Sequence, residues 1–165
     1  SGLKFVSWQD MAAAVDLAMD YLGARTAGAR HIIGYSTGAS LALDYTARAI
    51  EGQGGYLPAS LVLLSPAIRV SAAAGLARFK NSLSVLPGLE GMAWLDVMDE
   101  FDPYKYNSFA TNAGSQVHLV TSQVERRIAA ISGDAAKLSR FPPVLVLKSA
   151  VDSTVTTDAV VDHLL

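Results

Sequence analysis

The sequence predicts an α/β protein in which a parallel sheet lies between layers of helices. Three short apolar runs have the length of buried strands, at residues 31–35, 61–64 and 144–147. Segments with helical periodicity alternate with these runs, which favours parallel strands joined by right-handed crossovers. Hydrophobic residues make up 51% of the 165-residue chain and charged residues 17%, so we expect strands covered on both faces.

The first predicted helix starts at Ser7 and carries Asp10 in its first turn. Its apolar residues recur at helical spacing and predict one buried stripe, formed by Met11, Val15, Ala18 and Leu22. Gly23 and Gly28 mark the end of this helix.

A second helix is predicted directly after the first strand, from about Thr37 to Ile50. Glycines at 52–55 close it, and Ser65-Pro66 ends the strand that follows. The third strand is introduced by Pro142-Pro143, and a last helix is expected to begin near Thr156 or Thr157.

About 80 residues separate the second strand from the third, far more than a crossover needs. We therefore predict core segments at 1–66 and 141–165 and a helical, cap-like insertion over 67–140. Within the insertion, residues 89–98 read as helical, and a second apolar stripe ends at Gly133 (Val117, Val120, Val124, Ile128 and Ile131). Its aromatic residues either line an acyl-binding pocket or, the favoured interpretation, pack the insertion onto its domain (Phe79, Trp94, Phe101, Tyr104, Tyr106 and Phe109).

The sharpest chemical signal is Gly34-Tyr35-Ser36-Thr37-Gly38, a G-x-S-x-G between the first strand and the second helix. This setting holds a nucleophilic serine on a tight, strained turn. We expect both glycines, Gly34 and Gly38, to be required because a Cβ at either position would clash with nearby backbone. The plainer interpretation is a glycine-rich turn with a solvent-facing Ser36, and the nucleophile is favoured over it.

A second candidate is Asp152, which follows the strand at 144–147. Open α/β sheets place their ligands at the carboxyl ends of their strands, where Ser36 is also expected. A carboxylate there could orient a catalytic imidazole and stabilise the imidazolium. The alternative is an Asp that begins a turn or caps the last helix.

These features together resemble the α/β-hydrolase superfamily, in particular its capped lipase, esterase and lysophospholipase-like members. The resemblance depends on the G-x-S-x-G, on Leu-Val-Leu-Leu-Ser-Pro at 61–66, on the insertion, and on Val-Leu-Lys-Ser-Ala-Val-Asp at 146–152. It implies a partial sheet of the α/β-hydrolase type, with Ser36 as nucleophile and Asp152 as acid. It also implies that the Thr37 backbone N–H is one oxyanion donor and that an acyl-serine intermediate forms.

The family's histidine, which follows a further strand after the acid, has no clear counterpart. His163 is a weak candidate base inside the predicted last helix, His31 begins the first strand, and His118 lies in the insertion. In the family, a loop after an earlier strand supplies the second oxyanion N–H. The residues before Leu3 cannot form that strand and loop. We therefore expect this chain to be an incomplete portion of a hydrolase, inactive by itself. Its missing sheet strands would come from the rest of the parent chain or from self-association.

Composition excludes several other functions. A net charge of −2 gives no basis for binding nucleic acid, and no apolar run is long enough to span a membrane. The chain has no cysteine, no H-E-x-x-H and no phosphate-binding glycine motif, so we predict no metal and no cofactor. A soluble, cytoplasmic protein is slightly favoured, though the compartment stays open.

The expected partner is a small acyl substrate. Two alternatives remain: an acyltransferase, thioesterase or peptidase with the same nucleophile, and a non-catalytic hydrolase-like binding domain.

Overall fold

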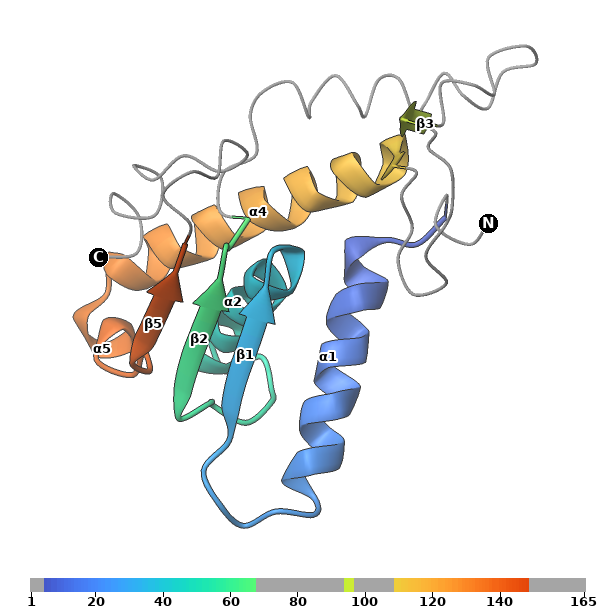
Figure 1. Ribbon diagram of the computed structural model, residues 1–165. Coiled ribbons are helices and arrows are strands. Elements are labelled where there is room, and N and C mark those ends of the chain that lie inside the picture. The colour runs from blue at the N-terminus through green and yellow to red at the C-terminus, as the bar shows by residue number, and fades with distance from the viewer. Residues whose placement is uncertain (1–4, 68–93, 97–108, 149–165) are drawn as a thin grey trace. The chain divides into compact units, whose positions relative to one another are not determined.

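The computed structural model describes residues 5–67, 94–96 and 109–148 (Figure 1). The chain divides into two compact units. One comprises residues 1–8 and 70–119, and the other, here called the sheet unit, comprises residues 9–69 and 120–165. The sheet unit holds the three parallel strands and the turn that carries Ser36.

The strands of the sheet unit are β1 (His31–Tyr35), β2 (Ser60–Leu64) and β5 (Val144–Leu147). They lie in the order β1-β2-β5, and both neighbouring pairs are parallel, as the apolar runs predict. Because Tyr35 pairs with Leu64 and Leu64 with Leu147, all three strands end level with one another. The residues that follow them therefore meet at one edge of the sheet.

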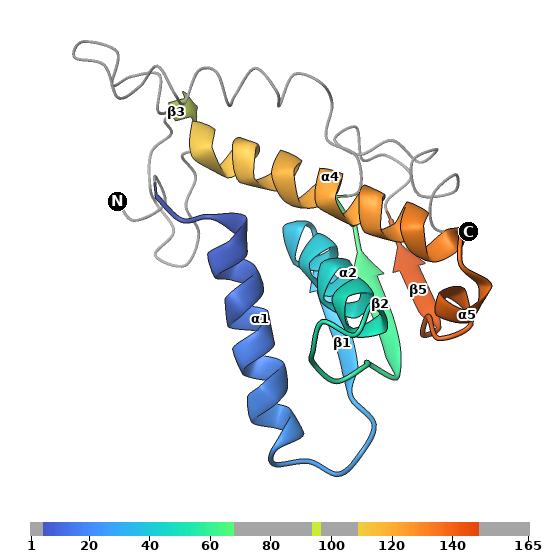
Figure 2. The same cartoon turned by 180° about the vertical axis from the view of Figure 1, so that it is seen from behind.

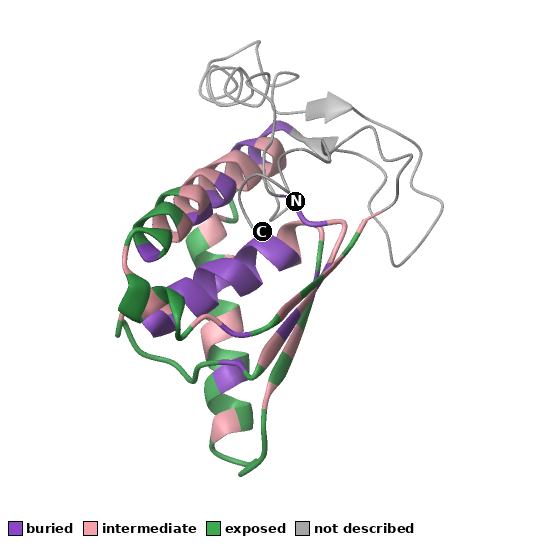
Figure 3. Ribbon diagram, turned by 90° about the vertical axis from the view of Figure 1, so that its left-hand side faces the viewer, coloured by how far each residue is buried: buried purple, intermediate pink, exposed green. Residues whose placement is uncertain are grey.

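Helix α2 (Thr37–Ile50) covers one face of this sheet, as Figures 1 and 2 show from opposite sides. Leu61 and Leu63 point toward it and are 1% and 0% exposed. The helix is buried almost all round (Figure 3). At its C-terminal end, Ala47 and Ile50 pack with Ile131 of α4 (Thr111–Ser132). A helix with so little exposed surface is a rigid support for the turn at its N-terminus.

Within residues 5–67, 94–96 and 109–148, no helix covers the opposite face of the sheet, where the sequence predicts a second covering layer. Two cross-strand rows lie there, Ile33–Val62–Leu145 and Tyr35–Leu64–Leu147. The outer members are 52–71% exposed (Ile33, Tyr35, Leu145 and Leu147). Strand order accounts for the described helices lying on one face. Successive right-handed crossovers that step across a sheet in one direction place their helices on the same face.

Helix α1 (Trp8–Gly23) begins beside the predicted Ser7, but its buried stripe is displaced by one position. Ala12 and Met19 are its buried residues, while Leu22, which the pattern placed inward, is 45% exposed. The prediction was wrong because apolar side chains occur on more than one face of this helix. An ion pair between Asp16 of α1 and Arg48 of α2 joins the two helices.

The predicted helix at residues 89–98 is wrong over Trp94–Asp96, which form strand β3. This strand pairs antiparallel with β4 (Phe109–Ala110). The second predicted stripe is confirmed, because α4 buries Val120, Val124 and Ile131 and ends just before Gly133. Residues 120–140 group with the sheet rather than with the other unit. A short helix, α5 (Ala135–Leu138), follows α4 and is capped by the side chain of Asp134.

Candidate active site

Ser36 lies between the last residue of β1 and the first residue of α2. Its backbone has φ 50° and ψ −119°. These angles match the first central position of a type II′ turn, about +60° and −120°, where glycine is the usual residue. A serine held there is strained by about 1–3 kcal/mol, a cost that proteins retain mainly at functional sites.

The side chain of Ser36 does not contribute to the helix that it begins. Serine at the N-cap of a helix commonly accepts a hydrogen bond from the second or third helical N–H. Ser36 occupies the N-cap of α2 and makes no such side-chain bond. The turn therefore keeps the hydroxyl out of the capping geometry, while the adjacent N–H groups of α2 lack intrahelical acceptors.

The two glycines of the motif have different surroundings. A Cβ on Gly34 would lie 2.6 Å from the Cα of Ala39 and 2.8 Å from its nitrogen, so the close approach of β1 and α2 requires glycine. A Cβ on Gly38 would meet nothing within 4 Å. The expectation of a clash is thus confirmed at Gly34 and wrong at Gly38, where the helix surface is open.

The segment that follows β2 packs against the same turn. Ser36 N–H donates to the carbonyl of Leu64 at 3.0 Å, and Ser65 N–H donates to that of Leu147 at 2.8 Å. Ser65 is the other non-glycine residue with positive φ in the described part of the chain, at 41°. Its strain carried no sequence signal beyond the Ser65-Pro66 pair that ends the strand.

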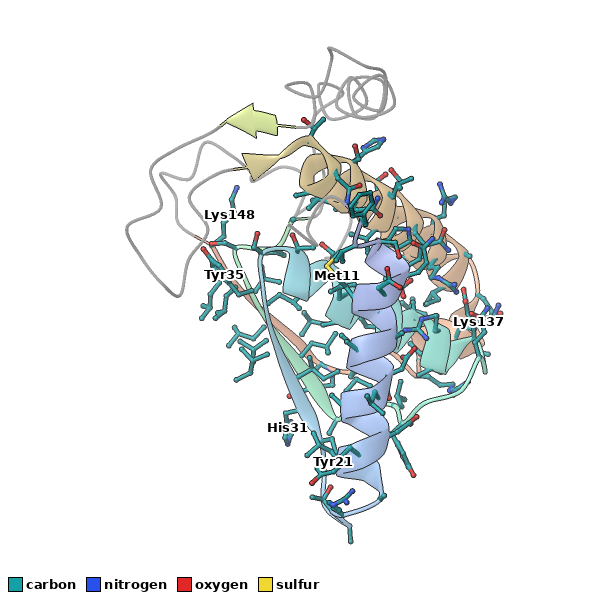
Figure 4. The ribbon with its side chains drawn as sticks, turned by 90° about the vertical axis from the view of Figure 1, so that its right-hand side faces the viewer. Met11, Tyr21, His31, Tyr35, Lys137 and Lys148 are labelled. Carbon is teal, nitrogen blue, oxygen red and sulfur yellow. The ribbon has the colours of Figure 1, made fainter. Side chains whose placement is uncertain are left out.

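Side chains at this end of the sheet are separated from those at the other end by the length of a strand. Figure 4 shows Tyr35 and Lys148 at the carboxyl edge and His31 at the opposite edge. The ring of His31 lies 2.8 Å from the hydroxyl of Ser60 (Nδ1 to Oγ) and is exposed. His31 is thus too far along β1 to act on Ser36, as its place in the sequence predicts.

Apart from Thr37, the structure does not place the other candidate residues relative to Ser36. Asp152 and His163 both lie outside the described residues. His118 is on α4 in the unit that does not contain Ser36. Thr37 is the first residue of α2 and directly follows Ser36, so its backbone N–H belongs to the peptide group next to the candidate nucleophile.

Residues 5–67, 94–96 and 109–148 contain no group of three or more His, Cys, Asp or Glu residues that could hold a metal ion. Within the same segments, no helix is long and apolar enough to cross a membrane.

Comparisons with known proteins find a similar fold but no similar sequence. No protein-family model matches the chain, and no curated protein matches it either. Among solved structures, a monoacylglycerol lipase from Paleococcus ferrophilus is similar, with a TM-score of 0.55 and 14% sequence identity. The match covers 87% of this chain, which spans 66% of the length of the lipase. The chain therefore has an α/β fold, with a partial parallel sheet and flanking helices like those of a lipase.

Proposed function

We propose that Ser36 is the nucleophile of a serine hydrolase that acts on carboxylic ester or related acyl bonds. The observation that carries this proposal is the backbone of Ser36, a non-glycine residue at φ 50° and ψ −119°. Glycine would relieve that strain, and a capping bond would compensate for part of it, yet neither is present. A hydroxyl displayed at the carboxyl edge of a parallel sheet is the arrangement that a nucleophile requires.

The chemistry would pass through a covalent intermediate. A base takes the Ser36 proton as Oγ attacks the acyl carbon, and the negative charge that develops on the carbonyl oxygen is stabilised by the Thr37 N–H. The leaving group departs with a proton from the base, and water then hydrolyses the acyl-serine. Asp152 would orient the base. We assign the base to a histidine that follows Asp152 in the chain. His163 is the candidate for this role within the 165 residues, and a weak one because it lies inside the predicted last helix.

An acyltransferase, thioesterase or peptidase would use the same nucleophile and differ in the acceptor or the bond. A non-catalytic binding domain of the same fold is the alternative from another class. The combination of strain with an uncapped hydroxyl at the carboxyl edge of the sheet favours catalysis, because strain alone also occurs at ligand-binding sites whereas a displayed hydroxyl is what a nucleophile requires.

The decisive experiment is labelling of the full-length protein that carries this chain with a fluorophosphonate probe. We expect the probe to modify Ser36 and Ser36→Ala to abolish both labelling and turnover of short p-nitrophenyl esters. Ser60→Ala is the matched control. Ser60 has a histidine at 2.8 Å but lies at the other edge of the sheet, where we assign no chemistry.

Each outcome has a distinct meaning. Labelling that survives Ser60→Ala and disappears in Ser36→Ala supports the proposal. Labelling of a serine other than Ser36 would overturn the assignment. A folded full-length protein that is not labelled at all would favour the binding domain.

A further inference from the structure

The carbonyl group of Ser36 is held by two backbone donors from different parts of the sheet unit. Ala39 N–H, in the first turn of α2, donates to it at 3.0 Å. Ala67 N–H, three residues beyond the end of β2, donates to it at 3.3 Å. The second donor is not part of the helix, so its position depends on whatever anchors the segment after β2.

The anchor is the hydroxyl of Ser40. Its Oγ donates to the carbonyl oxygen of Ala67 at 2.5 Å. Ser40 is 1% exposed and Ala67 is 7% exposed, so the bond is sheltered from water. Ser36, Ala67 and Ser40 thus form a closed link from the turn to the post-β2 segment and back to α2. We call this link the Ser40 clamp.

The Ser40 clamp acts on the peptide group that joins Ser36 to Thr37. A peptide group is planar and trans, so its C=O and N–H lie in one plane and point in opposite directions. Any restraint on the Ser36 carbonyl therefore also fixes the direction of the Thr37 N–H. That N–H is the oxyanion donor of the function proposed above.

We propose that Ser40 is a positioning residue for this reaction, acting through Ala67 to aim the Thr37 N–H at the oxyanion. The inference rests on the proposed function and adds to it a residue four positions beyond the nucleophile, buried and out of reach of substrate. Loss of one oxyanion donor costs about 10²–10³-fold in kcat. Misdirection of a donor that remains present should cost less, about 10-fold to 100-fold.

The test compares Ser40→Ala with Thr46→Val in the full-length protein. Thr46 is a good match because it is also a fully buried hydroxyl on α2, 0% exposed, that donates to a backbone carbonyl, that of Ala42 at 2.8 Å. Its bond lies within the helix and has no connection to the turn. We expect Ser40→Ala to lower kcat about 10-fold or more while KM changes less than about twofold, and Thr46→Val to leave both unchanged. Ser40→Thr, which keeps the hydroxyl, should restore kcat.

A second measurement does not depend on activity. Amide hydrogen exchange of Ala67 should accelerate in Ser40→Ala relative to Thr46→Val, because the Ala67 segment has lost its anchor. If Ser40→Ala does not fold, the same exchange and kcat measurements on Ser40→Thr and Ser40→Cys decide the question. The Ser40 clamp is supported if kcat falls further in Ser40→Cys than in Ser40→Thr, because a thiol donates a weaker hydrogen bond to the Ala67 carbonyl than a hydroxyl does.

The failure of this proposal can be told apart from the failure of the proposed function. Wild-type labelling at Ser36 with an unchanged kcat in both Ser40→Ala and Thr46→Val would overturn the Ser40 clamp and leave the nucleophile standing. A wild-type protein with no labelled serine would overturn both. Equal losses in Ser40→Ala and Thr46→Val would show that Ser40 only stabilises α2.

Discussion

At the scale of single residues, the two glycines that flank Ser36 fulfil different physical requirements. Gly34 lets the backbone of β1 approach that of α2 at Ala39, where a Cβ would overlap atoms that cannot move aside. Gly38 is surrounded by open space within the described structure. Only the first glycine is therefore explained by the packing of the fold itself.

This difference gives a paired prediction for the free energy of unfolding. Gly34→Ala should lower it by about 3 kcal/mol, because the added Cβ forces strand and helix apart. Gly38→Ala should leave it unchanged or raise it by up to about 1 kcal/mol, since alanine is the better helix former. Urea denaturation of both variants measures the two values. Equal destabilisation by the two substitutions would contradict this account of the turn.

The sequence could predict the turn at Ser36 but not which contacts hold it. A G-x-S-x-G pattern gives both glycines equal weight, whereas their surroundings depend on how closely a helix approaches a strand. The Ser40 clamp was not predictable either, because residues 40 and 67 meet only through the pairing of β1 with β2. Local patterns carry no information about such distant contacts.

At the scale of elements, α2 is held in place by charges as well as by its apolar face. Asp44, 0% exposed, lies 2.9 Å from Nε of Arg48 and 3.2 Å from Nε of Arg127 on α4. Arg48 also pairs with Asp16 of α1 at 2.8 Å, and Arg127 with Glu51. Burial acts to lower the pKa of Arg48, but hydrogen bonds to Asp16 and Asp44 outweigh it and raise that pKa. Three helices of the sheet unit therefore share one ion network.

We expect Asp44 to be the critical member of this network. Asp44→Asn should lower the free energy of unfolding by about 1–3 kcal/mol, because Arg48 and Arg127 lose the buried counter-charge that they share and keep only Asp16 and Glu51. Asp16→Asn is the matched control. Its carboxylate is 39% exposed, so solvent screening should limit the loss to about 1 kcal/mol or less. Thermal and urea unfolding of both variants provide the test, and a similar loss in both would show that burial of Asp44 is not decisive.

The parallel strands and helix α2 were predicted far better than strand β3 and the buried face of α1. Strands β1 and β5 and helix α2 have the predicted bounds, because continuous apolar runs bordered by glycine, proline or serine are unambiguous. Strand β3 was mistaken for helix, since its three residues depend on pairing with β4, which begins thirteen residues later. The stripe of α1 was misplaced because apolar residues such as Leu17 and Tyr21 also face solvent, at 73% and 56% exposure.

At the scale of the whole molecule, the sheet face that no described helix covers is the feature that most needs an explanation. Ile33 and Leu145 lie in one cross-strand row through Val62 and are 70% and 53% exposed. Contiguous apolar surface of this kind marks a place where other protein surface packs. In the full-length protein we expect the rest of the parent chain to cover it, as the partial sheet predicted from the sequence requires.

The 165-residue chain expressed alone should then self-associate through this face at micromolar concentrations. A charged residue in the row, Ile33→Lys or Leu145→Lys, should shift the chain toward monomer in sedimentation velocity, because a lysine ammonium opposes burial of the face. Leu17→Lys is the matched control, since Leu17 is as exposed as Ile33 but lies on helix α1 and not in the sheet. An equal shift with Leu17→Lys would mean that association is unspecific. A monomeric wild-type chain would mean that the apolar rows are stable in water without a partner. In the full-length protein the same Leu145→Lys should instead destabilise the fold, because a covered face has no water to receive the charge.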